Sequence, residues 1–332
     1  MGDLFKDILK ENESLFLDEV SLDFDYVPKE IPYREQSQKY VAECIKPLFQ
    51  NRSGRNLFIS GSPGIGKTLA IKHVLRELEL ETDEIIPIYI NCWKKDTSFK
   101  IISEICEQIG YKWTINKRTD ELLRAATNIL NKKSVVLCLD EVDKVKEIDI
   151  LYNLLEEILK KTIILITNNK EWLANLDHRI RSRLTPELIE FKPYNQEETS
   201  GILKTRRDFA FVPNVFQEEA FNLIVEKTAQ LKDMRSGLFL LRESGNQAEM
   251  RASKKIIKEH SEKALQKLES FKIKSSADFD EPTQLILNLV KKHQGMTIKE
   301  LYDSYIAENG DLAFSTFHKK IQDLKKNKMI EL

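Results

Sequence analysis

The sequence predicts an α/β fold with a parallel β-sheet, followed by a small helical domain and a C-terminal helix-turn-helix domain. Three observations support this prediction. Strand-like and helix-like apolar patterns alternate over the first part of the chain, a glycine-rich motif lies between the first such strand and helix, and strand patterns stop after Pro193. Alternation of this kind is typical of parallel sheets that carry helices on both faces.

Each predicted strand is a short apolar run bounded by polar or turn-forming residues. The predicted strands are residues 56–60, 85–91, 134–139, 162–167 and 187–191. Helical spacing of apolar residues predicts the intervening helices 36–50, 67–80, 97–109, 119–131 and 149–160. Ligands of such sheets bind at the carboxyl ends of the strands, so functional side chains are expected there.

Helical patterns continue alone beyond the last predicted strand. They cover residues 195–207, 216–230 and 234–268, and the polar stretch 272–282 predicts a linker. Three shorter helices follow, at 281–293, 297–307 and 315–327. The predicted domains are therefore 1–194 with a polar leader at its start, 195–271, and 272–332.

Residues 61–68 read Gly-Ser-Pro-Gly-Ile-Gly-Lys-Thr and match the G-x-x-x-x-G-K-[ST] phosphate-binding loop in full. Glycines let backbone N–H groups turn toward phosphates in conformations that larger side chains avoid. Lys67 would reach the β- and γ-phosphates, and the Thr68 hydroxyl would meet Mg²⁺. The alternative, a glycine-rich turn with a stray lysine, does not account for the flanking strand and helix. We therefore predict ATP or ADP with Mg²⁺ as cofactor, with contacts at Pro63, Gly64, Ile65, Gly66, Lys67, Thr68 and Leu69.

The apolar strand that begins near Val135 ends in two adjacent carboxylates, Asp140 and Glu141. Two neighbouring carboxylates are costly without a cation, and Mg²⁺ removes that cost. We expect Asp140 to join Thr68 at the metal and Glu141 to orient or polarise the attacking water. The alternative is an acidic turn after a core strand, which is the expected role of Asp143.

Other polar side chains are candidates for contact with the γ-phosphate. Asn168 follows the strand 162–167 and would position the water, although an Asn pair after a strand is also typical of a turn. Three arginines, at 179, 181 and 183, offer a guanidinium to a neighbouring subunit's phosphates, or else form a solvated basic helix face. Arg235 lies at the start of a helix in the second predicted domain, and from that domain it would touch the γ-phosphate.

The bulk composition is that of an ordinary globular protein, with 41% hydrophobic and 32% charged residues and a net charge of −1. This charge argues against a chain coated in positive charge, but a local patch is enough to bind DNA. The four cysteines lack metal-ligand spacing and indicate a reducing intracellular compartment. Neither a signal peptide nor a membrane-spanning run is predicted, so no membrane partner is expected.

The last predicted helix has a polar, basic face opposite its apolar stripe. Three short helices with a basic third helix suit a helix-turn-helix that enters the DNA major groove. The alternative is a solvated lysine face on a small helical domain. The exposed residues of this helix are predicted to be Ser315, Thr316, His318, Lys319, Gln322, Lys325 and Lys326.

In this order, these pieces resemble the origin-recognition (ORC)/Cdc-type replication initiators of archaea and eukaryotes, a branch of the AAA+ ATPases. The resemblance covers nearly the whole chain. Its more specific parts are the segments 24–35, 151–155, 176–184, 191–194 and 233–242. It implies an AAA+ core with a helical lid and a winged-helix-like C-terminal domain. It also implies nucleotide contacts from Tyr26, Val27, Arg34 and Tyr194.

The same resemblance assigns roles to residues already singled out. Asn168 corresponds to sensor 1 and Arg235 to sensor 2. Arg183 is the best match for the arginine finger, and Arg179 is a weaker match. A DNA-gripping helical hairpin would fall within 94–122, which makes Lys117 and Arg118 candidate DNA contacts. The chain departs from the family pattern in that hairpin, where the usual glycine-containing loop is replaced, and at residues 329–332, where the hairpin wing would begin.

The resulting expectation is an ATP-dependent initiator that binds duplex DNA of a replication origin, assembles with homologous initiator subunits and helps recruit the replicative helicase of the MCM type. Hydrolysis would be slow and would need a neighbour's arginine. The alternatives are a clamp-loader-like or chaperone-like remodeller of proteins, a DNA-binding regulator that holds nucleotide structurally, and a signalling ATPase whose last domain binds protein.

Overall fold

The computed structural model describes residues 14–277, 281–292, 296–308, 310 and 312–326. The chain divides into two compact units, Met1–Ser261 and Glu262–Leu332. The first unit contains the β-sheet and most of the helices, and the second contains the C-terminal helices.

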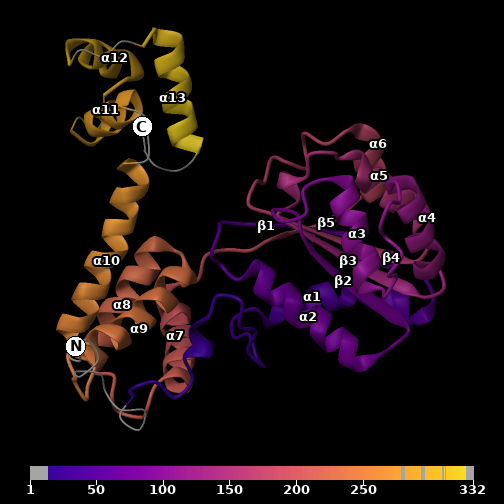
Figure 1. The fold of residues 1–332 in the computed structure, drawn as a ribbon, viewed down its shortest axis with the longest axis horizontal. Helices are drawn as coiled ribbons and strands as arrows, with labels where there is room; N and C mark the ends of the chain where they lie inside the picture. Colours follow the sequence, from indigo (N-terminus) through magenta and orange to yellow (C-terminus); the bar gives the residue numbers. More distant parts are fainter. Residues whose placement is uncertain (1–13, 278–280, 293–295, 309, 311, 327–332) are drawn as a thin grey trace. The chain divides into compact units, whose positions relative to one another are not determined.

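The first unit is built on a parallel sheet of five strands in the order β2-β3-β4-β1-β5 (Figure 1). This confirms the predicted parallel sheet. In register, Asn91 pairs with Asp140, and Ser60 pairs with Thr167, so the carboxyl ends of four strands lie together. The strands are β1 (Leu57–Ser60), β2 (Ile85–Asn91), β3 (Ser134–Asp140), β4 (Lys161–Thr167) and β5 (Glu187–Glu190).

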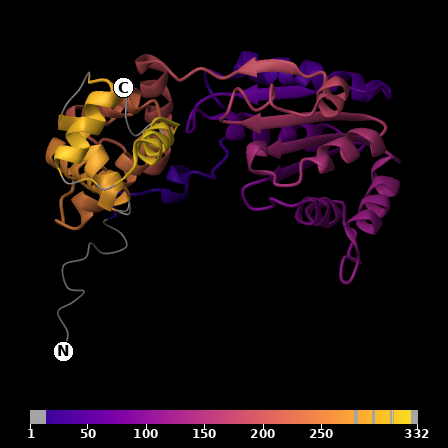
Figure 2. The ribbon, with the colours of Figure 1, turned by 90° about the horizontal axis from the view of Figure 1, so that it is seen from above.

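Helices cover both faces of this sheet, which lies between two helical layers in Figure 2. Successive side chains of a strand point to opposite faces, and β3 is buried on both. Leu137 therefore packs in one core and Cys138 in the other. One layer consists of α1 (Glu35–Ile45), η3 (Lys46–Gln50) and α2 (Lys67–Glu81). The other consists of α3 (Ser98–Gln108), α4 (Thr119–Leu130), α5 (Asp149–Glu157) and α6 (His178–Leu184).

A helical lid follows the sheet, and the leader segment, residues 14–34, packs against it. The Leu17 N–H donates to the Ala210 carbonyl at 2.8 Å, and the buried Arg206 guanidinium donates to the Ser21 carbonyl at 2.9 Å. The leader segment is therefore bonded to the lid although it precedes the sheet in sequence. The leader segment contains η2 (Glu19–Leu22), and the lid contains α7 (Gln196–Ala210), α8 (Glu218–Leu231) and α9 (Met234–Glu249).

The predicted single helix 234–268 is wrong, because α9 ends at Glu249 and α10 (Lys258–Ala277) begins after a turn. Ala252 lies in the left-handed region with φ 50°, which an uninterrupted helix excludes. Ile256 is fully buried, and its N–H donates to the Val215 carbonyl at 2.7 Å. Most of the polar stretch 272–282, which the sequence predicts to be a linker, is helical, since α10 continues to Ala277 and α11 starts at Glu281.

The second unit contains three short helices, α11 (Glu281–Lys292), α12 (Ile298–Ala307) and α13 (Phe314–Lys326), as the sequence predicts. They close around a core in which Tyr305 and Phe317 are nearly fully buried, with ring centroids 5.0 Å apart. A capping box between Thr297 and Glu300 begins α12. The position at which a wing would begin, residues 329–332, lies outside the described residues.

Across the part of the chain that the structure describes, no helix is both long enough and apolar enough to span a bilayer.

Candidate nucleotide site

The glycine-rich loop has the backbone conformation that phosphate binding requires. Gly64 and Gly66 have φ angles of 72° and 86°, in the region that favours glycine. Gly66 is the N-cap of α2, so the N–H groups of the first turn, which have no partner within the helix, face the loop. Such an N-terminus attracts anions through its backbone donors and its dipole. The sequence motif therefore folds into an anion-binding cradle.

Lys67 lies at the centre of this cradle. Its Nζ donates to the Gly61 and Ser62 carbonyls, both at 2.8 Å, and to the Asn168 side-chain oxygen at 2.7 Å. Burial lowers the pKa of Lys67 to about 8, and the nearby Glu141 opposes that shift. The carbonyls are neutral, whereas phosphate oxygens are negatively charged. The Lys67 ammonium is therefore placed to bind phosphate oxygens.

Asp140 is almost fully buried and accepts three hydrogen bonds. The Thr68 hydroxyl donates to its Oδ2 at 2.6 Å, the Tyr89 hydroxyl to the same oxygen at 2.7 Å, and the Glu141 N–H to Oδ1 at 2.9 Å. Hydroxyl and carboxylate oxygens are the ligands that Mg²⁺ prefers. Among the described residues no group of three or more His, Cys, Asp or Glu side chains is arranged to hold a metal ion. This donor set therefore fits Mg²⁺ that is completed by phosphates and water.

Glu141 faces Asn168, whose Nδ2 donates to both carboxylate oxygens at 3.1 and 2.9 Å. Burial and the neighbouring Asp140 raise the pKa of Glu141, while the Asn168 hydrogen bond opposes that rise. Glu141 has a φ of 55°, a conformation that costs free energy outside glycine. Asn168 thus joins Lys67 to Glu141, and the carboxylate is fixed at the carboxyl end of β3.

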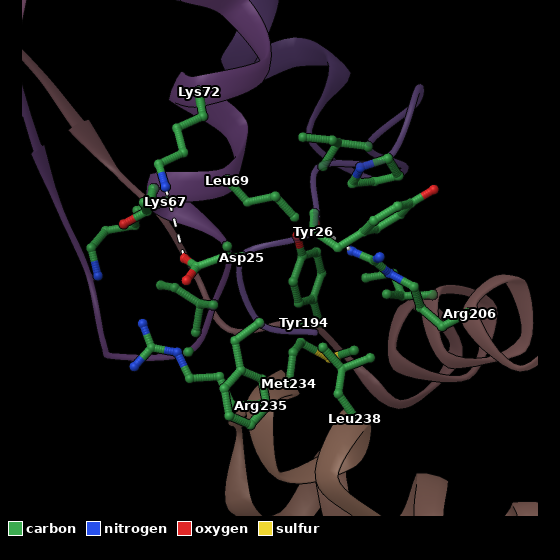
Figure 3. Close-up of a pocket in the computed structure, with 18 of the residues that line it drawn as sticks. Asp25, Tyr26, Lys67, Leu69, Lys72, Tyr194, Arg206, Met234, Arg235 and Leu238 are labelled. Atoms are coloured by element: carbon green, nitrogen blue, oxygen red, sulfur yellow. Dashed lines mark hydrogen bonds and ion pairs between the residues drawn. The ribbon is translucent and has the colours of Figure 1, made fainter. Parts of the chain in front are cut away.

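A cavity of about 420 Å³ lies beside these groups, between the sheet, the leader segment and the lid (Figure 3). It is lined by the phosphate loop from Pro63 to Leu69 and by Glu141 and Asn168. Tyr26 and Tyr194 line it from the leader segment and from the chain after β5. The lid contributes Ile202, Thr205, Arg206, Phe209, Met234, Arg235 and Leu238. Most of the residues predicted to contact nucleotide therefore share one cavity.

Val27 and Arg34 are not among the residues that line the cavity. Arg34 is instead buried behind the loop, with its Nη2 donating to the Ile65 and Lys192 carbonyls at 3.1 and 2.7 Å. Its guanidinium carbon lies 3.9 Å from the centre of the Tyr194 ring. Arg34 therefore positions the loop and Tyr194, and the structure gives it no direct approach to a base.

The lid contacts the phosphate loop at the start of α9. The Met234 N–H donates to the Gly64 carbonyl at 3.0 Å, and the Asp233 side chain caps the helix by accepting from the Arg235 N–H at 2.9 Å. The Arg235 side chain is exposed and lines the cavity. It lies in Figure 3 at the end of the cavity that also holds Lys67.

Several cavity residues had no signal in the sequence. Arg206 lies over the Tyr26 ring at 4.9 Å and donates to the Tyr26 carbonyl at 3.3 Å. Lys72 pairs with Asp25 at 3.8 Å across the cavity (Figure 3). In the sequence, these basic residues cannot be distinguished from ordinary surface charges of a helix. Only the folded structure shows that they lie at the cavity.

The three arginines of the 176–184 segment lie outside the cavity. Arg183 is half-exposed, forms an ion pair with Glu156, and lies over the Tyr152 ring at 5.0 Å. Arg179 pairs with Asp177 at 3.2 Å, and Arg181 donates to the Ala174 carbonyl at 3.3 Å. All three are therefore at the surface of this chain.

The candidate DNA contacts are also at the surface. Arg118 pairs with Asp120 at 3.1 Å, and Lys117 with Glu121 at 3.6 Å. On α13, Ser315, Thr316 and Lys319 are exposed, and Lys325 is half-buried.

Replacing Gly64 with alanine should weaken ATP binding about tenfold or more. A Cβ at Gly64 would meet Asp233 Oδ1 at 1.9 Å, so the cap of α9 and the Met234–Gly64 hydrogen bond would be lost. Each loss costs about 1 kcal/mol. Isothermal titration calorimetry measures the change.

Gly110→Ala is the matched control. Gly110 has nearly the same φ, 78°, but its Cβ would meet nothing within 4 Å. It should leave ATP affinity unchanged. Equal losses from both variants would mean that backbone strain, and not the contact between loop and lid, explains the result at Gly64.

Two family models match this chain. The AAA domain model matches residues 50–171, and the Cdc6 AAA+ ATPase-type lid model matches residues 200–266. The first matched segment contains β1 to β4 and the phosphate loop, and the second contains most of the lid helices. The fold and the site thus define an AAA+ ATPase.

Curated relatives that are similar in sequence narrow this class of protein to a family. ORC1-type DNA replication protein 1 of Sulfurisphaera tokodaii is 34% identical over 300 residues, which cover 85% of this chain and 75% of the relative. ORC1-type DNA replication protein 2 of Methanothermobacter thermautotrophicus is 30% identical, over 98% of this chain and 90% of the relative. The chain belongs to the family of ORC1-type DNA replication proteins.

Solved structures agree with this assignment. The Aeropyrum pernix ORC1 protein in complex with DNA matches with a TM-score of 0.72 and 25% identity, over 94% of this chain and 87% of that one. The Aeropyrum pernix ORC2 protein has a TM-score of 0.75 at 18% identity, over 94% and 90% of the two chains. The second match supports the fold alone.

Proposed function

We propose that this chain is an ATP-dependent initiator of DNA replication, which binds ATP with Mg²⁺ in the cavity and binds origin duplex DNA. The observation that carries the proposal is that the phosphate loop and Glu141 line one cavity, with Asp140 hydrogen-bonded to Thr68 of the loop, in a chain related over most of its length to replication proteins. It would assemble with homologous initiator subunits and help recruit an MCM-type helicase. The location would be the cytoplasm, in association with the nucleoid, for an archaeal protein like these relatives, and the nucleus for a eukaryotic one.

Three parts share this work in the proposal: an ATP-binding core (1–194), a lid (195–271) and a DNA-binding domain (272–332). The match of the AAA domain model to 50–171 and of the lid model to 200–266 supports the first two. The hydrogen bonds between the leader segment and α7 join this segment to the lid.

The nucleotide would lie along the cavity with its phosphates in the loop. Lys67 and the N–H groups of the loop would bind the β- and γ-phosphates. Thr68 and Asp140 would hold Mg²⁺, which when bound neutralises charge on the phosphate oxygens. Tyr26, Leu69 and Tyr194 would surround the sugar and base, and Arg206 would hold Tyr26 in place.

Hydrolysis would depend on the Glu141–Asn168 pair. Glu141 would orient a water and accept its proton, and Asn168 fixes the carboxylate through its two hydrogen bonds. Arg235 would touch the γ-phosphate from the lid, and Arg183 would reach the phosphates of a neighbouring subunit. A reaction that waits for a neighbour is slow, so bound ATP would act as a switch.

DNA would meet the basic face of α13, with Lys319 and Lys325 on backbone phosphates and Ser315 and Thr316 near the start of the helix. Lys117 and Arg118 would add contacts from the core. Support comes from the exposure of Ser315, Thr316 and Lys319, and from the relative that was solved in complex with DNA.

The test is fluorescence anisotropy of labelled duplex DNA with ATP, with ADP and without nucleotide, at two salt concentrations. The proposal expects binding that weakens with salt and differs between nucleotide states. Absence of binding at low salt in every nucleotide state would contradict it.

The double variant Lys319→Ala, Lys325→Ala should weaken DNA binding across sequences. It should also flatten the slope of log affinity against log salt by up to about 2, since each lost phosphate contact removes about 0.9. The same anisotropy titration measures both effects. The control is Lys39→Ala with Lys204→Ala, which removes two exposed lysines from α1 and α7. An equal change in slope from both double variants would show that α13 is not part of the DNA interface.

A further inference from the structure

Tyr89 is a partly buried residue beside the proposed metal site, and the sequence motifs do not include it. Its hydroxyl donates to Asp140 Oδ2 at 2.7 Å, from β2 to the neighbouring strand β3. Thr68 donates to the same oxygen at 2.6 Å, and the Glu141 N–H donates to the other. Of the two side chains that orient this carboxylate, Thr68 is itself a proposed metal ligand. Tyr89 is the other side-chain donor, and it is not a proposed metal ligand.

The backbone of Tyr89 is fixed as well. β2 is an edge strand of the sheet and pairs with β3 on one side. On its other side the side chain of Gln108, at the end of α3, forms two hydrogen bonds with Tyr89. The Tyr89 N–H donates to Gln108 Oε1 at 3.2 Å, and Gln108 Nε2 donates to the Tyr89 carbonyl at 2.8 Å.

The ring of Tyr89 carries a cation on its face. The Lys72 ammonium lies 4.8 Å from the ring centre, and it also pairs with Asp25 of the leader segment at 3.8 Å. A cation above a phenol ring strengthens the hydroxyl as a donor, because it stabilises negative charge that develops on the oxygen. Contacts thus run from the leader segment through Lys72 and Tyr89 to Asp140.

We propose that Tyr89 is a positioning residue for the metal-nucleotide complex: its hydroxyl holds the Asp140 carboxylate in the orientation that receives Mg²⁺, and Gln108 holds Tyr89. This inference rests on the proposed binding of ATP with Mg²⁺ in the cavity. Hydrogen bonds to a ligating carboxylate fix its rotamer, so the metal site is formed before the metal arrives. A tyrosine that only filled space would not have its hydroxyl on the metal ligand.

The test is Tyr89→Phe in the full chain, with ATP binding followed at increasing Mg²⁺ concentration and separately in EDTA. The Mg²⁺ concentration for half-maximal ATP binding should rise about tenfold, the usual effect of removing a partner of a metal ligand. Affinity for ATP in EDTA should stay unchanged, since Tyr89 is not among the residues that line the cavity.

The matched control is Tyr40→Phe. Tyr40 also donates to a carboxylate, Glu187 Oε2 at 2.9 Å, but between α1 and β5. It should leave the Mg²⁺ requirement unchanged. Gln108 is exposed, so Gln108→Met tests the same proposal without altering the Tyr89 ring, and it should raise the Mg²⁺ requirement by less than Tyr89→Phe.

An unchanged Mg²⁺ requirement in Tyr89→Phe overturns the inference, as does an equal loss of ATP affinity with and without Mg²⁺, which would mark a purely structural role. If Tyr89→Phe does not fold, the inference is decided by Gln108→Met. Wild-type protein that shows no Mg²⁺-dependent ATP binding would instead refute the proposed function, which is a separate result.

Discussion

Lys67→Met should lower the affinity of this chain for ATP by about 100-fold or more. A hydrogen bond between charged partners contributes about 1.5–3 kcal/mol, and 1.4 kcal/mol corresponds to a factor of ten. Lys67 is the buried cation of the loop, and its present partners are two backbone carbonyls and Asn168. Methionine keeps the apolar stem but offers nothing to the phosphates. Isothermal titration calorimetry with ATP measures the loss.

The control is Lys133→Met. Lys133 also donates to a backbone carbonyl, that of Asp83 at 2.6 Å, but it is exposed and remote from the loop in sequence. It should bind ATP as the wild type does. Because burial penalises the charged form of Lys67, its removal should not lower the melting temperature without nucleotide. Normal ATP affinity in Lys67→Met would exclude the loop as the phosphate site.

The strands and the phosphate loop were predictable because their signals are local. A strand buried on both faces is typically a continuous apolar run, as residues 135–139 are. The loop needs glycine where φ is positive, and the motif places Gly64 and Gly66 there. In both cases neighbouring residues alone decide the conformation.

The break between α9 and α10 was not predictable from local patterns. Residues 234–268 keep a helix-like apolar spacing, and the turn forms because Ile256 is buried beside β-bridge partner Phe216. That contact joins segments 40 residues apart in sequence, so helix propensity does not report it. The polar composition of 272–277 likewise predicted a linker, although polar residues such as lysine and serine also occur on exposed helix faces.

The phosphate end of the site was predictable, and the supporting residues were not. Lys67, Asp140 and Glu141 belong to motifs, whereas Arg206 and Tyr89 act through partners that only the fold brings near. Arg34 shows the converse: resemblance placed it at the base, but it donates to the backbone carbonyls of residues 65 and 192.

Glu141→Gln should retain ATP binding and slow ATP hydrolysis by about 100-fold or more, the usual contribution of a general base. Glutamine has the shape of the carboxylate and removes the repulsion from Asp140, so affinity should not fall. It does not accept a proton from water. Phosphate release under single-turnover conditions, with a nucleotide titration beside it, separates chemistry from binding.

The control for this variant is Glu147→Gln, which neutralises a carboxylate that accepts from the Ser98 N–H at 3.1 Å and does not line the cavity. It should hydrolyse ATP at the wild-type rate. If ATP acts as a switch, Glu141→Gln should also keep the DNA affinity of the ATP-bound state long after the wild type has changed to that of the ADP-bound state. Wild-type hydrolysis in Glu141→Gln would mean that Glu141 is not the base. Unchanged function without hydrolysis would favour a regulator that holds its nucleotide as a structural group, because such a protein has no need of the Glu141–Asn168 pair.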